Sequence, residues 1–338
     1  MDELPHSKFS LPDRTYQAIV RAELKKMAEL AGFHGHRLGE MEIIIAEITS
    51  NLVKHATKGG EIYARPVKFP APGMEMIVID HGPGMNKPLK MMEDGISSSK
   101  TLGQGLGAIR RLSDKFDLYS LLNWGTILYS LSFLNRKSQI AKNAINISAL
   151  NVCKKGEVVC GDAYSLIDTG KRIRIALLDG LGHGLQANIA AKEGARSFSL
   201  LAGIRPSEQL RIMHNDLKKT RGAVVTLVQI DEVNKQILYC GVGNISMKIV
   251  GPAKSRSCLA YNGIVGHIMP STIGDHHLPW ENASDTLVMH SDGLSARWDL
   301  QKYPGILLHH GMILCAALFK DFNRDNDDST VIVAKYVK

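Results

Sequence analysis

Residues 173–184 read IRIALLDGLGHG, an apolar run that stops at Asp179 and continues into closely spaced glycines. An apolar run of this length is typical of a buried strand, and the glycines after it permit a tight turn. The same arrangement recurs where TLVMHS leads into Asp292, and we expect Asp162 to follow a strand in EVVCG. The sequence therefore predicts acidic residues at the ends of strands that lie far apart in the chain.

A fourth acidic position lies near the end of the sequence, where Asp327 and Asp328 precede STVIVAKY. A single aspartate at a strand end is commonly a turn former. Four of them beside apolar strands suggest convergence, and carboxylates brought together repel one another unless cations neutralise them. Ligand sets made only of oxygen select hard ions such as Mg²⁺ or Mn²⁺.

Composition indicates a globular protein of two ordinary domains, because the chain has 338 residues with 44% hydrophobic and 22% charged. The net charge of +8 is not concentrated in any run of five or six like charges, so nucleic-acid binding is not expected. Five cysteines without a C-x-x-C pair fit a reducing compartment. The sequence has no 18-residue apolar stretch and no signal-like start, so we expect a cytoplasmic protein with no membrane contact.

The first 136 residues are expected to form one domain, an α/β sandwich with helices on one face of a mixed sheet. Residues 39–56 give the strongest helical signal, because Met41, Ile45, Ile48 and Leu52 form one apolar stripe. The predicted elements are helices over 12–31 and 39–56, strands over 61–68, 74–80, 116–120 and 126–133, and a helix of about ten residues after a Ser- and Gly-rich loop at 95–107.

The polar stretch 137–146 is predicted to be a linker, and 147–338 to be a second domain built mainly of short strands. We expect two packed sheets flanked by helices, which makes the whole chain α+β. The predicted strands cover 147–153, 157–160, 173–178, 223–230, 236–240, 246–250, 286–290 and 330–336, and the predicted helices 185–201, 206–219 and 305–319.

Three polar and glycine-rich elements follow one another in the first domain. Glu47 and Asn51 share one helix face, Asp80 ends a strand before GPGM at 82–85, and GQGLG occupies 103–107. A solvated helix face would account for the first pair alone. The glycines let backbone approach a ligand, and a loop that enters a helix can hold phosphate. The spacing G-x-G-x-G without a preceding strand does not fit a dinucleotide fingerprint.

Together these elements resemble the N, G1 and G2 boxes of the GHKL ATPase/kinase family over residues 40–130. The stretch MEDGISSSKTLGQGLGAIRRLSDKF at 92–116 is most similar to the small switch serine kinases of the bacterial sigma-B stressosome cascade. The resemblance implies ATP with Mg²⁺ held by Asn51, a base at Glu47 and an adenine contact at Asp80. It also implies a pocket and lid shaped by Gly82, Gly84, Gly103, Gly105, Gly107 and Thr126.

The signatures D-G-x-G-H-G, S-D-G and D-D-x-T resemble the SpoIIE-like branch of the PPM-type phosphatases over 147–338. The resemblance implies two Mn²⁺ or Mg²⁺ ions that activate a water, with Asp179 and Asp292 at the centre of the chemistry. The implied ligands are Asp162 and Asp179 for one ion, and Asp179, the Gly180 carbonyl, Asp292 and Asp327 for the other. Asp328 is the alternative to Asp327.

The two resemblances imply a kinase–phosphatase fusion acting on serine or threonine of a STAS-domain phosphoprotein in a partner-switching stress pathway. In the alternative, the first domain only binds a nucleotide or a sigma factor and regulates the phosphatase. An anti-sigma regulator is a further expected partner. No arginine is identified as a grip for the substrate phosphate, so we expect specificity to depend on protein–protein docking.

Overall fold

The computed structural model describes residues 4–88, 105–136, 144–201, 203–251, 255–280 and 284–337. The chain forms two compact units, which are described separately. The first comprises His6–Lys142 together with Leu300–Ala317, and the second comprises Met1–Pro5, Asn143–Asp299 and Leu318–Lys338. Leu300–Ala317 lies within the predicted second domain, but the structure groups it with the first unit.

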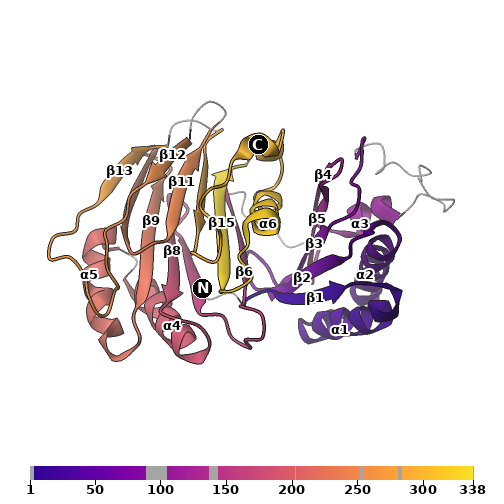
Figure 1. The fold of residues 1–338 in the computed structure, drawn as a ribbon, viewed down its shortest axis with the longest axis horizontal. Coiled ribbons are helices and arrows are strands. Elements are labelled where there is room, and N and C mark those ends of the chain that lie inside the picture. Colours follow the sequence, from indigo (N-terminus) through magenta and orange to yellow (C-terminus); the bar gives the residue numbers. More distant parts are fainter. Residues whose placement is uncertain are drawn as a thin grey trace. The chain divides into compact units, whose positions relative to one another are not determined.

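The first unit is a five-stranded antiparallel sheet with helices on one face (Figure 1). Its strand order is β1-β2-β3-β5-β4. The strands are β1 Ser7–Leu11, β2 Gly60–Val67, β3 Gly73–Asp80, β4 Lys115–Leu121 and β5 Gly125–Phe133, and the helices are α1 Gln17–Leu30, α2 Gly35–His55 and α3 Gly105–Leu112. The predicted apolar stripe of α2 is buried in the core between helices and sheet. β1 is a short edge strand whose mixed sequence, SKFSL, carries too weak an alternation to be predicted.

The opposite face of this sheet packs against residues of the segment Leu300–Ala317. Asp117 and Tyr119 point to that face because Leu118 between them faces the helices. Asp117 Oδ1 lies 2.9 Å from His309 Nδ1, and Asp117 Oδ2 accepts a 2.6 Å hydrogen bond from the backbone N–H of His310. Tyr119 donates to the carbonyl of Pro304 at 3.1 Å. These contacts attach a late part of the chain to the first unit.

The second unit contains two five-stranded antiparallel sheets with orders β13-β10-β9-β8-β7 and β12-β11-β14-β15-β6 (Figure 1). One core contains apolar residues of both sheets, and another lies where α4 and α5 cover the sheet that contains β8. The strands are β6 Ile145–Val152, β7 Asp162–Asp168, β8 Arg172–Gly180, β9 Ala223–Asp231, β10 Gln236–Val242, β11 Ser246–Val250, β12 Ser255–Cys258, β13 His276–Pro279, β14 Thr286–His290 and β15 Ser329–Tyr336, and the helices are α4 Leu185–Leu200 and α5 Pro206–Asp216. The α+β class is confirmed.

The prediction of a strand at 157–160 is wrong, and this changes where Asp162 lies relative to a strand. Residues 157–160 form an irregular connection in which Val158 is 93% exposed, so its β-branched residues do not mark a buried strand. Asp162 is the first residue of β7 and does not follow a strand.

The last predicted helix also begins later than expected. Two 3₁₀ turns, Leu300–Lys302 and Ile306–Leu308, precede α6, which spans Gly311–Phe322. No helix among the described residues is long and apolar enough to cross a membrane.

Two candidate active sites

In the first unit, Glu47 and Asn51 lie four residues apart on α2, and the start of α3 lies against both of them. A Cβ at Gly105 would lie 2.5 Å from Glu47 Oε2 and 3.7 Å from Asn51 Nδ2. A side chain at position 105 would therefore force the carboxylate of Glu47 to move. The predicted acid, amide and glycine therefore lie together, with both polar side chains half-buried.

The loop after β3 forms a second wall of the same region, because it contacts the end of α2. The Gly82 N–H donates to Asp80 Oδ1 at 2.5 Å, which holds the turn. A Cβ at Gly82 would lie 2.3 Å from the carbonyl oxygen of His55, the last residue of α2. Gly84 has φ +72° and is packed against the carbonyl oxygen of Leu121, so it also requires a glycine.

Thr126 pairs with Asp80 across β5 and β3, at the end of the sheet where this loop begins. Ser120 Oγ lies 2.9 Å from Thr126 Oγ1 and accepts a 2.8 Å hydrogen bond from the N–H of Met85. Gly107 is buried in α3. Of the predicted nucleotide-site residues, Gly103 lies outside the described residues.

In the second unit, hydroxyl groups join three strands around Asp162. Asp162 lies opposite Asp179 in the β7–β8 pairing. Ser291 Oγ donates to Asp162 Oδ2 at 2.6 Å, and Thr330 Oγ1 donates to the same oxygen at 2.8 Å. Since Ser291 follows β14 and Thr330 lies on β15, these bonds bring the ends of both sheets to one place.

Asp292, Asp327 and Asp328 occupy the same end of the two sheets. Asn244 Nδ2 donates to Asp292 Oδ2 at 2.9 Å. A Cβ at Gly293 would lie 2.1 Å from the carbonyl oxygen of Asp328, so the turns that carry the two acids are in contact. Asp327 Oδ1 accepts from the N–H of Asp328 at 2.9 Å, whereas Asp328 is 3% exposed and accepts from the N–H of Lys154.

Electrostatics show that this cluster is unfavourable without cations. Burial, followed by the charges of the neighbouring aspartates, raises the pKa of Asp179 to about 9. Burial likewise raises the pKa of Asp162 to about 7, against the lowering effect of the hydroxyl donors. At neutral pH these carboxyls resist ionisation in the protein alone, so bound cations would stabilise their charged forms.

The donor set fits hard divalent ions. Asp162 Oδ1 is buried without a hydrogen-bond partner among the described residues, which leaves one carboxylate oxygen available. In the described part of the chain, only Cys153, Cys160 and Asp328 form a trio of Cys, His, Asp or Glu donor atoms within 4.8 Å of one another. Asp328 of this trio is the alternative ligand to Asp327, whereas the predicted set of Asp162, Asp179, Asp292 and Asp327 forms no such trio among the described residues.

The sequence analysis did not identify Ser291, Thr330 or Asn244 as site residues. Ser291 and Thr330 stand in the quoted S-D-G and D-D-x-T signatures, so the signal was present. Their hydrogen bonds orient Asp162 and Asp292, two of the predicted metal ligands, and removing such partners typically weakens metal binding.

Each half of the chain is similar to known proteins. Residues 10–128 match the histidine kinase-like ATPase domain family, and residues 169–337 match the family described as stage II sporulation protein E (SpoIIE). Serine/threonine-protein kinase RsbT of Bacillus subtilis is 32% identical over 110 residues, which cover 32% of this chain and 83% of RsbT. Phosphoserine phosphatase RsbX of the same organism is 28% identical over 147 residues, which cover 42% of this chain and 71% of RsbX.

Two solved structures also resemble this chain. RsbX in complex with magnesium has a TM-score of 0.52 at 23% identity, covers 58% of this chain and 97% of its own, and shows the fold. A chain from a structure reported as "The bacterial stressosome: a modular system that has been adapted to control secondary messenger signaling" has a TM-score of 0.50 at 27% identity, covering 56% of this chain and 99% of that one.

Fold and site together define a PPM-type, divalent-metal-dependent serine/threonine phosphatase domain preceded by a kinase-like ATPase domain. The chain belongs to the SpoIIE family.

Proposed function

We propose that this protein both phosphorylates and dephosphorylates serine or threonine on a STAS-domain protein of a partner-switching stress pathway. The observation that carries the proposal is the close approach of Gly105 to Glu47 and Asn51, in a unit that shares its chain with a phosphatase domain. A pure scaffold has no need for a carboxylate at this position.

In the first unit, Asn51 would hold Mg²⁺ on the phosphates of ATP and Asp80 would accept from the adenine amine. Glu47 would take the proton from the attacking hydroxyl. Phosphoryl transfer depends on positioning and charge neutralisation more than on covalent chemistry with the protein. The close contacts of the glycines with α2 and with Leu121 at the end of β4 support such positioning.

In the second unit, Asp162, Asp179, Asp292, Asp327 and the Gly180 carbonyl would hold two ions, Mn²⁺ or Mg²⁺. When bound, such ions lower the pKa of a water and supply a nucleophile for phosphorus. Ser291 and Thr330 fix the orientation of Asp162, and Asn244 fixes that of Asp292. These hydrogen bonds would keep the two carboxylates in place while the substrate enters.

The partner is proposed from the similarities. RsbT and RsbX are a kinase and a phosphatase, and one structural relative comes from a stressosome study. We propose that a STAS-domain phosphoprotein is the shared substrate, with a sigma factor or an anti-sigma regulator as a further partner. The five cysteines are free, consistent with the proposed cytoplasmic location.

A second candidate follows from the contacts of Leu300–Ala317. Because this segment lies in the phosphatase half of the sequence and packs on the sheet of the first unit, nucleotide binding there could regulate the phosphatase without phosphoryl transfer. In that case ATP would change the phosphatase rate even when Glu47 is replaced.

The test uses Asp292→Ala, which should trap phosphate on the substrate by disabling hydrolysis. Incubation with ATP, Mg²⁺ and a candidate STAS protein should add one phosphoryl group to the STAS protein by intact mass. The matched control, Glu47→Ala with Asp292→Ala, should show no gain while still binding ATP. An unchanged mass in the first variant, together with ATP-dependent phosphatase activity of Glu47→Ala alone, would favour the regulatory candidate.

A further inference from the structure

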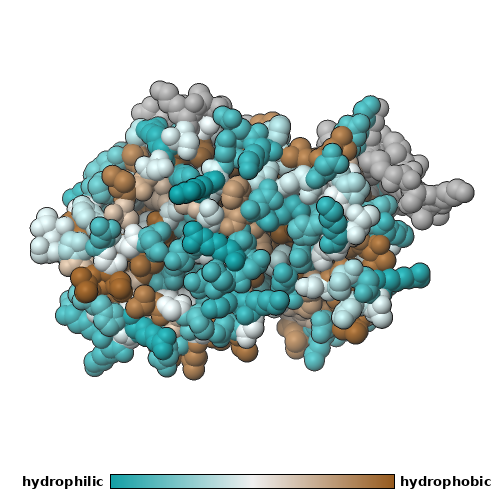
Figure 2. Space-filling view, in the orientation of Figure 1, coloured by the Kyte–Doolittle hydropathy of each residue, from teal (hydrophilic) through white to brown (hydrophobic). Residues whose placement is uncertain are grey.

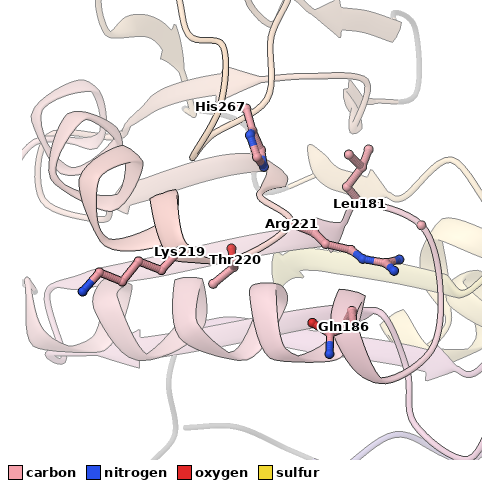
Figure 3. Close-up of a pocket in the computed structure, with 7 residues that line it drawn as sticks. Leu181, Gln186, Lys219, Thr220, Arg221 and His267 are labelled. Atoms are coloured by element: carbon pink, nitrogen blue, oxygen red, sulfur yellow. The ribbon is translucent and has the colours of Figure 1, made fainter.

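A hollow of about 560 Å³ lies beside the glycine-rich loop that follows Asp179 (Figure 3). Residues lining it include Leu181, Lys219, Thr220, Arg221 and His267, and no acidic side chain of the described residues lines it. This volume lies within the usual range for ligand sites. The cavity shares the loop 181–182 with the metal-site segment, because Gly180 directly precedes it.

Backbone hydrogen bonds build this hollow from three separate segments. The N–H of Leu181 donates to the carbonyl of Gly222 at 3.0 Å, and the N–H of Ala223 donates to the carbonyl of Val265 at 3.0 Å. Gly222 has φ +73°, and a Cβ there would lie 2.6 Å from the ring of His267. The turn that carries Lys219 and Arg221 is therefore fixed against both neighbouring loops.

The turn itself is also held internally. Thr220 Oγ1 donates to the carbonyl of Leu217 at 2.8 Å and accepts from the N–H of Gly222 at 3.0 Å. Such local bonds reduce the conformational freedom that a ligand would otherwise have to remove. The cations on either side of Thr220 are thus presented by a preorganised turn.

Lys219 and Arg221 are exposed and have no ion-pair or hydrogen-bond partner among the described residues. Arg221 Nη1 lies 3.2 Å from the position that a Cβ would take on Gly182, so its guanidinium reaches the loop after Asp179. Figure 3 shows the side chains of Lys219 and Arg221 extending in opposite directions along the hollow. This arrangement suits a ligand with more than one negative group.

The surroundings indicate that the ligand is a protein segment. Leu181 at the rim is 46% exposed, and Leu185 and Ile189, one turn apart on the adjoining α4, are 62% and 44% exposed. Figure 2 shows that hydrophilic residues cover most of the face in view, with apolar residues in small groups. Apolar side chains beside unpaired cations fit a partner that contributes both acidic and apolar residues.

We propose that this basic hollow binds the acidic segment flanking the phosphorylated residue of the protein substrate. The proposal rests on the proposed phosphatase function and adds a specificity site to it. Arg221, nearest the loop after Asp179, would contact the acidic residue closest to the phosphoserine, and Lys219 one further along. Arg221 could not be assigned from the sequence, because no sequence pattern connects residue 221 with residue 182; the role proposed here is in docking, and no arginine is assigned to the phosphate itself.

The test compares two phosphoserine peptides that differ only in having acidic or neutral flanking residues. With the Mn²⁺-loaded full chain, we expect Lys219→Glu with Arg221→Glu to reduce the ratio of kcat/KM values, acidic over neutral, by about tenfold. The effect should appear mainly in KM and weaken at high salt. The control Lys171→Glu makes the same type of charge change in the turn before β8, roughly 25 Å along the strand from Asp179, and should leave the ratio unchanged.

An unchanged ratio in the double variant, or an equal fall in the ratio in the control, would overturn the proposal. So would a wild-type ratio of one. Fluorescence anisotropy of the labelled acidic peptide on Asp292→Asn tests binding without turnover, and competition by millimolar inorganic phosphate as strong as by acidic peptide would assign the hollow to a small anion instead. If the wild-type chain hydrolyses neither peptide nor p-nitrophenyl phosphate, the phosphatase function fails, while the anisotropy result still decides the hollow.

Discussion

The predicted nucleotide site of the first unit and the acidic cluster of the second differ in what brings their polar groups close together. Around Glu47 and Asn51, glycines allow backbone to approach half-buried polar side chains that belong to one helix. Around Asp162 and Asp179, strand ends from two sheets force carboxyls together, and burial raises their pKa values to about 7 and 9. The first site therefore depends on glycines that leave room for close contacts. The second depends on carboxylates whose charged forms are stabilised by bound cations.

The largest effect is expected from Asp179→Asn. Phosphatase activity on p-nitrophenyl phosphate with Mn²⁺ should fall by three orders of magnitude or more, on the order of what losing the activated water implies. In the metal-free protein the same change should raise the melting temperature at pH 8, because the carboxyl with its pKa of about 9 must take up a proton on folding and the amide need not. A variant that loses activity and also melts lower without metal would contradict the comparison.

Glu47→Ala should lower phosphoryl transfer by roughly 10²–10⁴-fold, the usual contribution of a positioned base. ATP affinity should change little, which isothermal titration calorimetry would measure. Asn51→Ala is the matched variant and should weaken Mg²⁺–ATP binding itself. Equal kinase rates in wild type and Glu47→Ala would remove the proposed base.

Ser291→Ala and Thr330→Val should each weaken Mn²⁺ binding by about 10–100-fold, because Asp162 Oδ2 loses one of its two donors. The double variant should lose more Mn²⁺ affinity than either single variant. Metal titration followed by phosphatase activity measures the effect, and Ser257→Ala on the short strand β12 provides a control. Unchanged metal affinity in both single variants would show that these hydroxyls are only structural.

The acidic cluster of the second unit should make the free energy of unfolding depend on pH. Asp162 and Asp179 have native pKa values of about 7 and 9, whereas the ordinary value is 3.8. Between the ordinary and the native pKa values, the folded protein therefore holds more protons than the unfolded chain. The free energy of unfolding of the metal-free protein should therefore fall as pH rises from about 4 to 9. Saturating Mn²⁺ should flatten this dependence in urea unfolding at several pH values, and a metal-free stability that rises with pH would contradict it.

The smallest effect is expected from Asp117→Asn, which removes the charged acceptor for His309 and the N–H of His310. The first unit should lose about 1–3 kcal/mol, the usual cost of a broken charged hydrogen bond. Proteolysis within Leu300–Ala317 should also become faster. Glu23→Gln, on the exposed face of α1, is the control, and equal proteolysis rates in both variants would mean that Asp117 does not hold the segment.

Local patterns in the sequence were enough to predict most helices and strands of both halves. The apolar stripe of α2 repeats at helical spacing, and the segment of β8 from Ile173 to Leu178 is apolar except for Arg174, so burial could be predicted from neighbouring residues alone. The irregular connection at 157–160 could not, because β-branched residues also occur where the chain is exposed.

The sequence by itself determined which residue types were available: the aspartates of the signatures, the helix pair Glu47 and Asn51, and the glycines between strands. Tertiary structure alone decided that Ser291 and Thr330 share one oxygen of Asp162, that Arg221 reaches the loop at Gly182, and that Leu300–Ala317 packs with the first unit. The reason is that helix and strand periods are local, whereas contacts across sheets depend on register and close packing between segments distant in the chain.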